Sequence, residues 1–250
     1  MIIHIKKLPT EVDRLAAALV SRQVIAKPTC VLGLATGKTT EGLHREMVKG
    51  CRSLGIDYSQ VSTFNLDEYV GLAPDDPTSC RARINQDLLT KINIRLENTF
   101  VPDGMAQSLE QECREYERNI ARHGGIDLQI LSIGENGHIA FNEPGTPFGT
   151  KMRIAEISAS TVEAKKELFG TADNVPTHGI TMGIRNIMQA KQILLIAKGR
   201  HKAEIIQKAL FGPITERVPA SVLQLHPFLT VVLDAEAAGR LNMKPGTFEI

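Results

Sequence analysis

The segment from Gly134 to Gly145 (GENGHIAFNEPG) places a histidine and two carboxylates among glycines, directly after an apolar run. His138 and Glu143 predict an acid/base pair, because a carboxylate bonded to one ring nitrogen fixes the tautomer and leaves the other nitrogen to move a proton. Gly134 and Gly137 let the chain turn sharply and bring the ring close to a ligand. The alternative is a loop in which His138 caps a turn and Glu143 is solvated.

Asp67 and Glu68 form a second group of chemically capable residues, at the end of the apolar run 61–66. A carboxylate at a strand end can act as a base if it is partly desolvated and close to a substrate C–H, and it can also cap the next helix. Adjacent side chains point in different directions. We therefore expect one of the two to face a site.

The segment Thr36 to Thr39 (TGKT) follows another apolar run and offers amides, hydroxyls and a lysine to an anion. It resembles a nucleotide-binding P-loop, but three residues separate Gly33 from Gly37 where that loop needs four. A phosphate-binding loop of another kind and a plain tight turn are the alternatives. Thr36, Gly37, Lys38 and Thr39 are therefore candidate phosphate ligands. Lys202, at the start of a predicted helix, is either a further contact or a surface lysine.

The sequence predicts neither a metal nor a redox cofactor. It has no H-E-x-x-H segment, His138 has no histidine partner at helical spacing, and the four cysteines form no C-x-x-C pair. No G-x-S-x-G elbow follows a predicted strand, which argues against serine hydrolase chemistry.

Five short apolar runs must position these groups, and each predicts a strand: 31–35, 61–66, 128–133, 193–197 and 229–233. Helical patterns lie between them at 10–26, where Thr10 can cap the first turn, at 108–123 and at 202–210. Strands that are apolar on both faces and alternate with helices predict a doubly wound, mostly parallel α/β sheet with helices on both faces, as in Rossmann-like folds. Four of the strands run into polar loops, so we expect a small-molecule site at their carboxyl edge.

Composition limits the remaining classes. The 250 residues fit a single domain over 1–250, and 42% hydrophobic with 23% charged residues are ordinary for a globular protein. A net charge of +1 with 4% aromatic residues argues against a nucleic-acid partner. No apolar stretch is long enough for a membrane span or a signal core. These features, with scattered cysteines, predict a cytoplasmic protein with reduced thiols.

The segments LATGKT, FNLDEYVGL and GENGHIAFNEPG, together with Gly179–Gly183, Gly199–Lys202 and Leu223–Pro227, resemble the glucosamine-6-phosphate deaminase (isomerase) family in order and spacing over nearly the whole chain. The resemblance implies a Rossmann-like domain and hydrolytic deamination of glucosamine 6-phosphate to fructose 6-phosphate and ammonia, in amino-sugar catabolism and without a cofactor. By the same resemblance Asp67 is the base between C2 and C1. His138 opens the sugar ring with support from Glu143 and Asn136, and Thr36 to Thr39 with Lys202 bind the phosphate.

Four residues depart from the pattern of that family. Lys38 stands where a small residue is usual, Thr40 where proline is frequent, and Glu167 near the place of an arginine that holds phosphate. We therefore expect a phosphate site rebuilt around Lys38, or a different substrate. Cys80 replaces an aromatic residue and resembles the galactosamine-6-phosphate branch.

The alternatives to a glucosamine enzyme are a galactosamine-6-phosphate deaminase, a 6-phosphogluconolactonase and a non-catalytic sugar-phosphate sensor. The partner expected in each case is a small sugar phosphate. The sequence leaves the epimer, allosteric regulation and homo-oligomer formation open.

Overall fold

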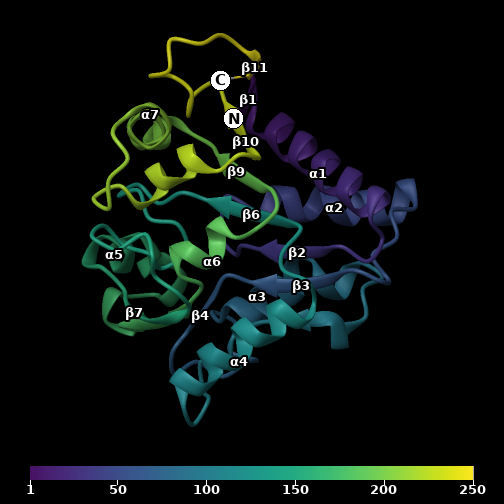
Figure 1. Cartoon of the computed structure of the whole chain (residues 1–250), viewed down its shortest axis with the longest axis vertical. Coiled ribbons are helices and arrows are strands. Elements are labelled where there is room, and N and C mark those ends of the chain that lie inside the picture. The colour runs from purple at the N-terminus through teal and green to yellow at the C-terminus, as the bar shows by residue number, and fades with distance from the viewer. Residues whose placement is uncertain (250) are drawn as a thin grey trace.

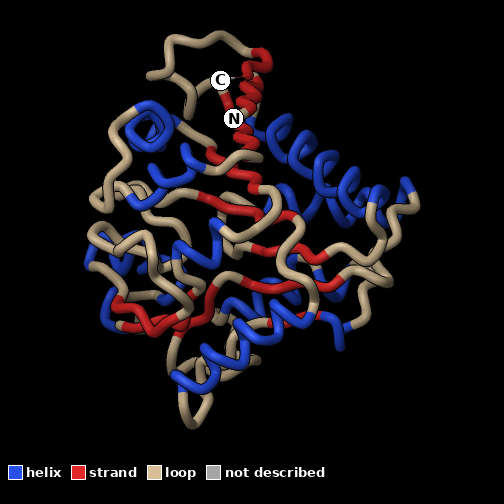
Figure 2. The backbone as a smooth tube through the Cα atoms, in the orientation of Figure 1, coloured by secondary structure: helices blue, strands red, loops and turns tan. Residues whose placement is uncertain are grey.

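The computed structural model describes residues 1–249, and its main feature is an eight-stranded sheet (Figures 1 and 2). The strand order is β11-β1-β10-β9-β6-β2-β3-β5, and every pair is parallel except β1 with β11. The bounds are β1 Ile2–Lys6, β2 Val31–Leu34, β3 Ser62–Asn65, β5 Thr99–Phe100, β6 Leu128–Ser132, β9 Ile193–Ala197, β10 Leu229–Asp234 and β11 Gly246–Glu249. All five predicted strands are confirmed, with every end within one residue of the prediction.

Helices cover both faces of this sheet, as the apolar runs predicted. One apolar core receives side chains from α1 (Pro9–Ala26), α2 (Glu41–Leu54) and α3 (Cys80–Asp87); the other receives them from α4 (Leu109–Arg122), α6 (Ile184–Met188) and α7 (Ala203–Phe211). Successive strand residues alternate between the two cores. Val31 lies in the core that α4, α6 and α7 cover, and Leu32 lies in the core that α1, α2 and α3 cover, because neighbouring side chains of a strand point to opposite faces.

A second sheet was not predicted. It is antiparallel, in the order β4 (Asp67–Tyr69), β8 (His178–Thr181), β7 (Arg153–Glu156), and it lies beside α5 (Ala159–Phe169) near one end of the main strands (Figure 1). Helix α5 has a single buried residue, Thr161, among its eleven. Val162 and Phe169 pack against a small apolar cluster that includes Tyr69 and Phe141, so the helix is held over the edge of the sheet, where its charged side chains can face a ligand.

The predicted cap at Thr10 is wrong. Helix α1 begins at Pro9, whose missing N–H suits the first helical position. The backbone amides of Lys7 and Leu8 donate to the Glu11 carboxylate, which fixes the chain just before the helix. The helix expected from 202 also begins later, because Arg200–Lys202 form a short 3₁₀ turn before α7.

Candidate active site

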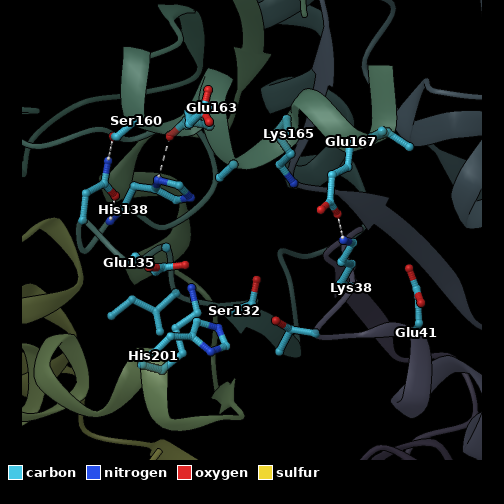
Figure 3. A pocket seen from close by; sticks show the side chains of 18 of the residues that line it. Lys38, Glu41, Ser132, Glu135, His138, Ser160, Glu163, Lys165, Glu167 and His201 are labelled. Carbon is cyan, nitrogen blue, oxygen red and sulfur yellow. Dashed lines mark hydrogen bonds and ion pairs between the residues drawn. The ribbon is translucent and has the colours of Figure 1, made fainter. Parts of the chain in front are cut away.

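The polar loops that follow β2, β6 and β9 meet at the carboxyl edge of the main sheet, as expected. They line a cleft of about 930 Å³, which we call the outer cleft. Lys38 and Thr39 come from the first loop, Glu135 and His138 from the second, and Lys202 from the third, while α5 closes the opposite side (Figure 3).

A smaller cavity of about 60 Å³, the inner recess, adjoins the outer cleft. Thr36, Asp67 and Cys80 line the inner recess but not the outer cleft. The residues that line both cavities are Arg83, Ser132, His138, Thr161 and Lys165. A small molecule in the outer cleft can therefore extend one end toward Asp67.

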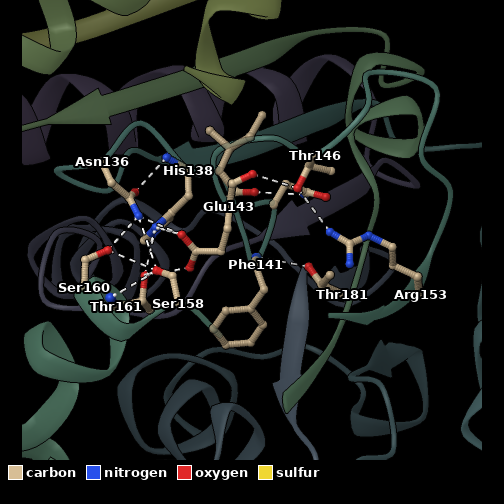
Figure 4. A network of polar contacts seen from close by, with 12 residues as sticks. Asn136, His138, Phe141, Glu143, Thr146, Arg153, Ser158, Ser160, Thr161 and Thr181 are labelled. Atoms are coloured by element: carbon tan, nitrogen blue, oxygen red, sulfur yellow. Dashed lines mark hydrogen bonds and ion pairs between the residues drawn. The ribbon is translucent and has the colours of Figure 1, made fainter. Parts of the chain in front are cut away.

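His138 is held by a network of polar side chains (Figure 4). Its Nδ1 lies 3.2 Å from Thr161 Oγ1 and 3.4 Å from Glu143 Oε2. Asn136 Nδ2 donates to Glu143 Oε2 at 2.7 Å, and Asn136 Oδ1 accepts from the His138 amide at 3.1 Å. Asn136 thus ties the histidine backbone to the carboxylate that faces its ring.

The same network assigns the tautomer of His138. The Thr161 hydroxyl donates to Glu143 Oε1 at 2.6 Å, so its oxygen is left to accept from Nδ1–H of the ring. Nε2 is then the nitrogen that can exchange a proton with a ligand. Burial raises the pKa of Glu143, but hydrogen bonds and charge from His138, with bonds from Thr161 and Asn136, outweigh it and lower the pKa to about 2. Glu143 therefore remains a carboxylate at neutral pH.

Glycines allow the close approach of this loop. A Cβ at Gly134 would lie 2.4 Å from His138 Cε1, which leaves no room for a side chain where the ring sits. Gly137 has a φ of 91°, a conformation that other residues rarely adopt. The backbone path expected from the sequence is thus the path observed.

Asp67 and Glu68 point in different directions, as expected. Both Glu68 oxygens accept backbone amides, including those of Cys80 and Arg81 at 2.8 Å, so this side chain caps α3. Asp67 faces the inner recess, where Cys80 Sγ lies 3.7 Å from its Oδ1. Burial raises the pKa of Asp67 to about 7, although the positive charge of Lys165 opposes the rise. Such a carboxyl is suited to proton transfer near neutral pH.

The predicted phosphate loop has a defined shape. The Thr40 side chain donates to the carbonyls of Ala35 and Gly37 and closes the turn at the start of α2. Thr36 faces the inner recess and Thr39 faces the outer cleft, whereas Gly37 lines neither. The loop thus presents its two threonines to different parts of the site.

Lys38 is already engaged by another residue. Its Nζ lies 2.6 Å from Glu167 Oε2 of α5, and both side chains are about three-quarters exposed or more, at 80% and 74%. Lys202 also lines the outer cleft but is half-buried, and burial lowers its pKa. The two lysines proposed for phosphate binding therefore have different environments.

The residues that line both cavities and were not predicted from the sequence include Thr161 and Lys165 of α5 and Arg83 of α3. No motif contains them. The sequence offers one signal for them: Thr161 and Lys165 are four residues apart, which places both on one face of a helix.

The described residues offer neither a metal-binding cluster nor a membrane-spanning helix. Among residues 1–249, no group of three or more histidine, cysteine, aspartate or glutamate side chains is arranged to hold a metal ion. The same residues include no helix that is long and apolar enough to cross a membrane. All four cysteines are free.

Curated relatives and solved structures resemble this chain along most of its length. A glucosamine-6-phosphate deaminase of Thermoanaerobacter pseudethanolicus is 47% identical over 228 residues, which cover 91% of this chain and 90% of the relative. One of Lachnoclostridium phytofermentans is 49% identical, with 89% and 94% covered. The solved structure of a monomeric glucosamine-6-phosphate deaminase superposes with a TM-score of 0.94 at 40% identity, covering 96% of this chain and all of that one.

A more distant structure shares the fold alone. The 6-phosphogluconolactonase of Trypanosoma brucei has a TM-score of 0.76 at 18% identity, with 96% and 98% of the two chains covered. The model of the glucosamine-6-phosphate isomerase/6-phosphogluconolactonase family matches residues 5–231. The chain belongs to this family.

Proposed function

We propose that this protein is a glucosamine-6-phosphate deaminase, which converts glucosamine 6-phosphate and water into fructose 6-phosphate and ammonia. The observation that carries the proposal is that Asp67 and His138 line one inner recess, where burial raises the pKa of Asp67 and the Glu143 carboxylate faces the His138 ring. Aldose-ketose isomerisation needs one group for a carbon-bound proton and another for the ring oxygen. The high identity to curated deaminases supports the same reaction.

The proposed mechanism assigns one proton transfer to each group. His138 Nε2 transfers the proton that opens the pyranose ring, while Glu143 and Asn136 hold the imidazole. The Asp67 carboxylate then removes the proton from C2 while the carbonyl oxygen on C1 takes up the proton that the C2 ammonium group gives up, which forms an enolamine. Asp67 next delivers its proton to C1. The C2–N group becomes an iminium, and water adds to C2 as ammonia leaves, which gives the ketone of fructose 6-phosphate.

The phosphate is proposed to bind at the mouth of the outer cleft. Of the predicted ligands, Lys38, Thr39 and Lys202 line this cleft, whereas Thr36 lines only the inner recess and Gly37 lines neither cavity. The exposed pair of Lys38 with Glu167 must exchange one partner for the phosphate. An exposed ion pair is screened by solvent and contributes little to stability, so this exchange costs little.

Galactosamine 6-phosphate is the second candidate substrate. Cys80, the residue that resembles the galactosamine branch, lines the recess next to Asp67 and so lies where the reacting carbons would be. The cytoplasmic location expected from the sequence stays a prediction, and so does the oligomeric state.

The test is ammonia release from each amino-sugar phosphate, with lactone hydrolysis of 6-phosphogluconolactone measured in parallel. We expect ammonia and fructose 6-phosphate in equal amounts from glucosamine 6-phosphate. Release from galactosamine 6-phosphate alone would transfer the assignment to that epimer. Lactone hydrolysis without ammonia release would contradict the proposal.

A further inference from the structure

Lys165 is the charged residue of α5 whose role is unexplained. The other charged side chains of this helix are paired: Glu163 with Lys166, and Glu167 with Lys38. Within residues 1–249 the Lys165 ammonium group has neither an ion pair nor a hydrogen bond. It lines both cavities, and Figure 3 shows it pointing into the outer cleft.

The helix aims Lys165 at this place. Thr161 lies one turn earlier on the same face, where it bonds to Glu143 and His138. Because Thr161 is buried and fixes the rotation of α5, the residue four positions later must project toward the same cavity. Lys165 is half-buried, so its ammonium group has lost part of its hydration.

A second unpaired lysine lies across the cleft. The Lys202 ammonium likewise has no ion pair or hydrogen bond among the described residues, and it lines the outer cleft. Burial is the main reason that its pKa is lowered; Glu135 opposes this change and Lys165 adds to it. Two ammonium groups that repel across a cavity form a favourable arrangement once a dianion lies between them.

We propose that Lys165 is a substrate-binding residue, which holds the phosphate of the sugar phosphate together with Lys202. This inference rests on the proposed function. Lys165 and Lys202 are then the principal phosphate ligands, and Lys38 adds a contact from the rim when it exchanges Glu167 for the phosphate. The specificity of the site for a phosphorylated sugar comes from α5 and the loop after β9.

The experiment measures the binding of glucitol 6-phosphate, an open-chain sugar phosphate that has no amino group to lose, by titration calorimetry. For Lys165→Met we expect a Kd at least about tenfold higher, because charge-assisted hydrogen bonds to an anion are strong. Lys166→Met removes a lysine from the same helix and should bind within about twofold of the unchanged protein. Unphosphorylated glucitol reports how much of the affinity depends on the phosphate.

Lys165→Gln is the second variant, and circular dichroism checks that both variants are folded. A Kd within twofold of the unchanged protein for both would overturn the proposal. So would an unchanged Kd combined with a shift in the pH profile of kcat/KM, since Lys165 would then act on Asp67 alone. If the unchanged protein binds glucitol 6-phosphate but releases no ammonia, the proposed function fails while the test of Lys165 stands.

Discussion

Two carboxylates lie at this site, and their surroundings are opposite. Glu143 accepts hydrogen bonds from Asn136 and Thr161 and faces the His138 ring, and its pKa is lowered to about 2. Asp67 lies in the inner recess with a thiol as its hydrogen-bond partner, and burial raises its pKa to about 7. The same functional group is thus a fixed charge in one place and, in the other, the group that we propose to carry a proton.

The two carboxylates also have opposite effects on the stability of the folded state. Asp67 has a folded-state pKa above its ordinary value of 3.8, so the folded state loses stability as the pH rises from about 4 to about 7. Glu143 has a folded-state pKa below its ordinary value of 4.5, so its contribution is present at neutral pH and is lost as the pH falls toward 2. The proposed base costs stability, and the carboxylate that holds the histidine adds to it.

Replacing the proposed base should have the largest effect. We expect Asp67→Asn to lower kcat by about 10²–10⁴-fold, the usual contribution of a general base. The same change should raise the free energy of unfolding at pH 8 by on the order of 1 kcal/mol, because a partly desolvated charge is removed. Steady-state kinetics and urea unfolding measure the two effects. A variant that loses both activity and stability would contradict the conclusion that the Asp67 carboxylate destabilises the folded state.

Replacing the other carboxylate should reverse the sign of the stability effect. Glu143→Gln keeps the shape but removes the charge that accepts from Thr161 and Asn136, so we expect unfolding at pH 7 to be easier by about 1–3 kcal/mol. We expect kcat to fall by about 10–100-fold, because the imidazole loses its orientation. Urea unfolding at pH 7 and at pH 3 checks the cause: the deficit should shrink at the lower pH.

The pH dependence of the unchanged protein should show the smallest effect. With a pKa of about 7, Asp67 is roughly half ionised at pH 7 and about one-tenth ionised at pH 6, so kcat/KM should fall about fivefold between them. Glucitol 6-phosphate binding over the same range corrects for ionisation of the substrate phosphate. A corrected profile that is flat down to pH 5 would show that the base is not a carboxyl with a raised pKa.

The main sheet could be predicted because its strands are apolar on both faces. Val31 and Leu32 enter different cores, and because both faces of the strand are buried, its residues form a continuous hydrophobic run in the sequence. The second sheet leaves no such run. Its first strand has three residues and two of them, Asp67 and Glu68, are charged. Asp and Glu have a low intrinsic preference for strands, so it is the pairing with β8 that makes these residues a strand.

The site was predictable where chemistry is encoded in local sequence. His138, Glu143 and Asn136 lie within eight residues, and their mutual contacts follow from one turn. Thr161 and Lys165 could not be found in this way, because α5 carries no apolar stripe and reaches the site through tertiary packing alone. The ion pair of Lys38 with Glu167 joins residues 129 positions apart, so no sequence pattern reveals it.

The most direct test of the role of Asp67 is exchange of the C2 proton. Glucosamine 6-phosphate is incubated in D₂O with the unchanged protein or with Asp67→Asn, and NMR follows deuterium at C1 and C2, with glucitol 6-phosphate binding as the control for an intact site. We predict that the unchanged protein catalyses exchange and that the variant binds normally without exchange. Exchange at a near-normal rate in Asp67→Asn would contradict the assignment of the base.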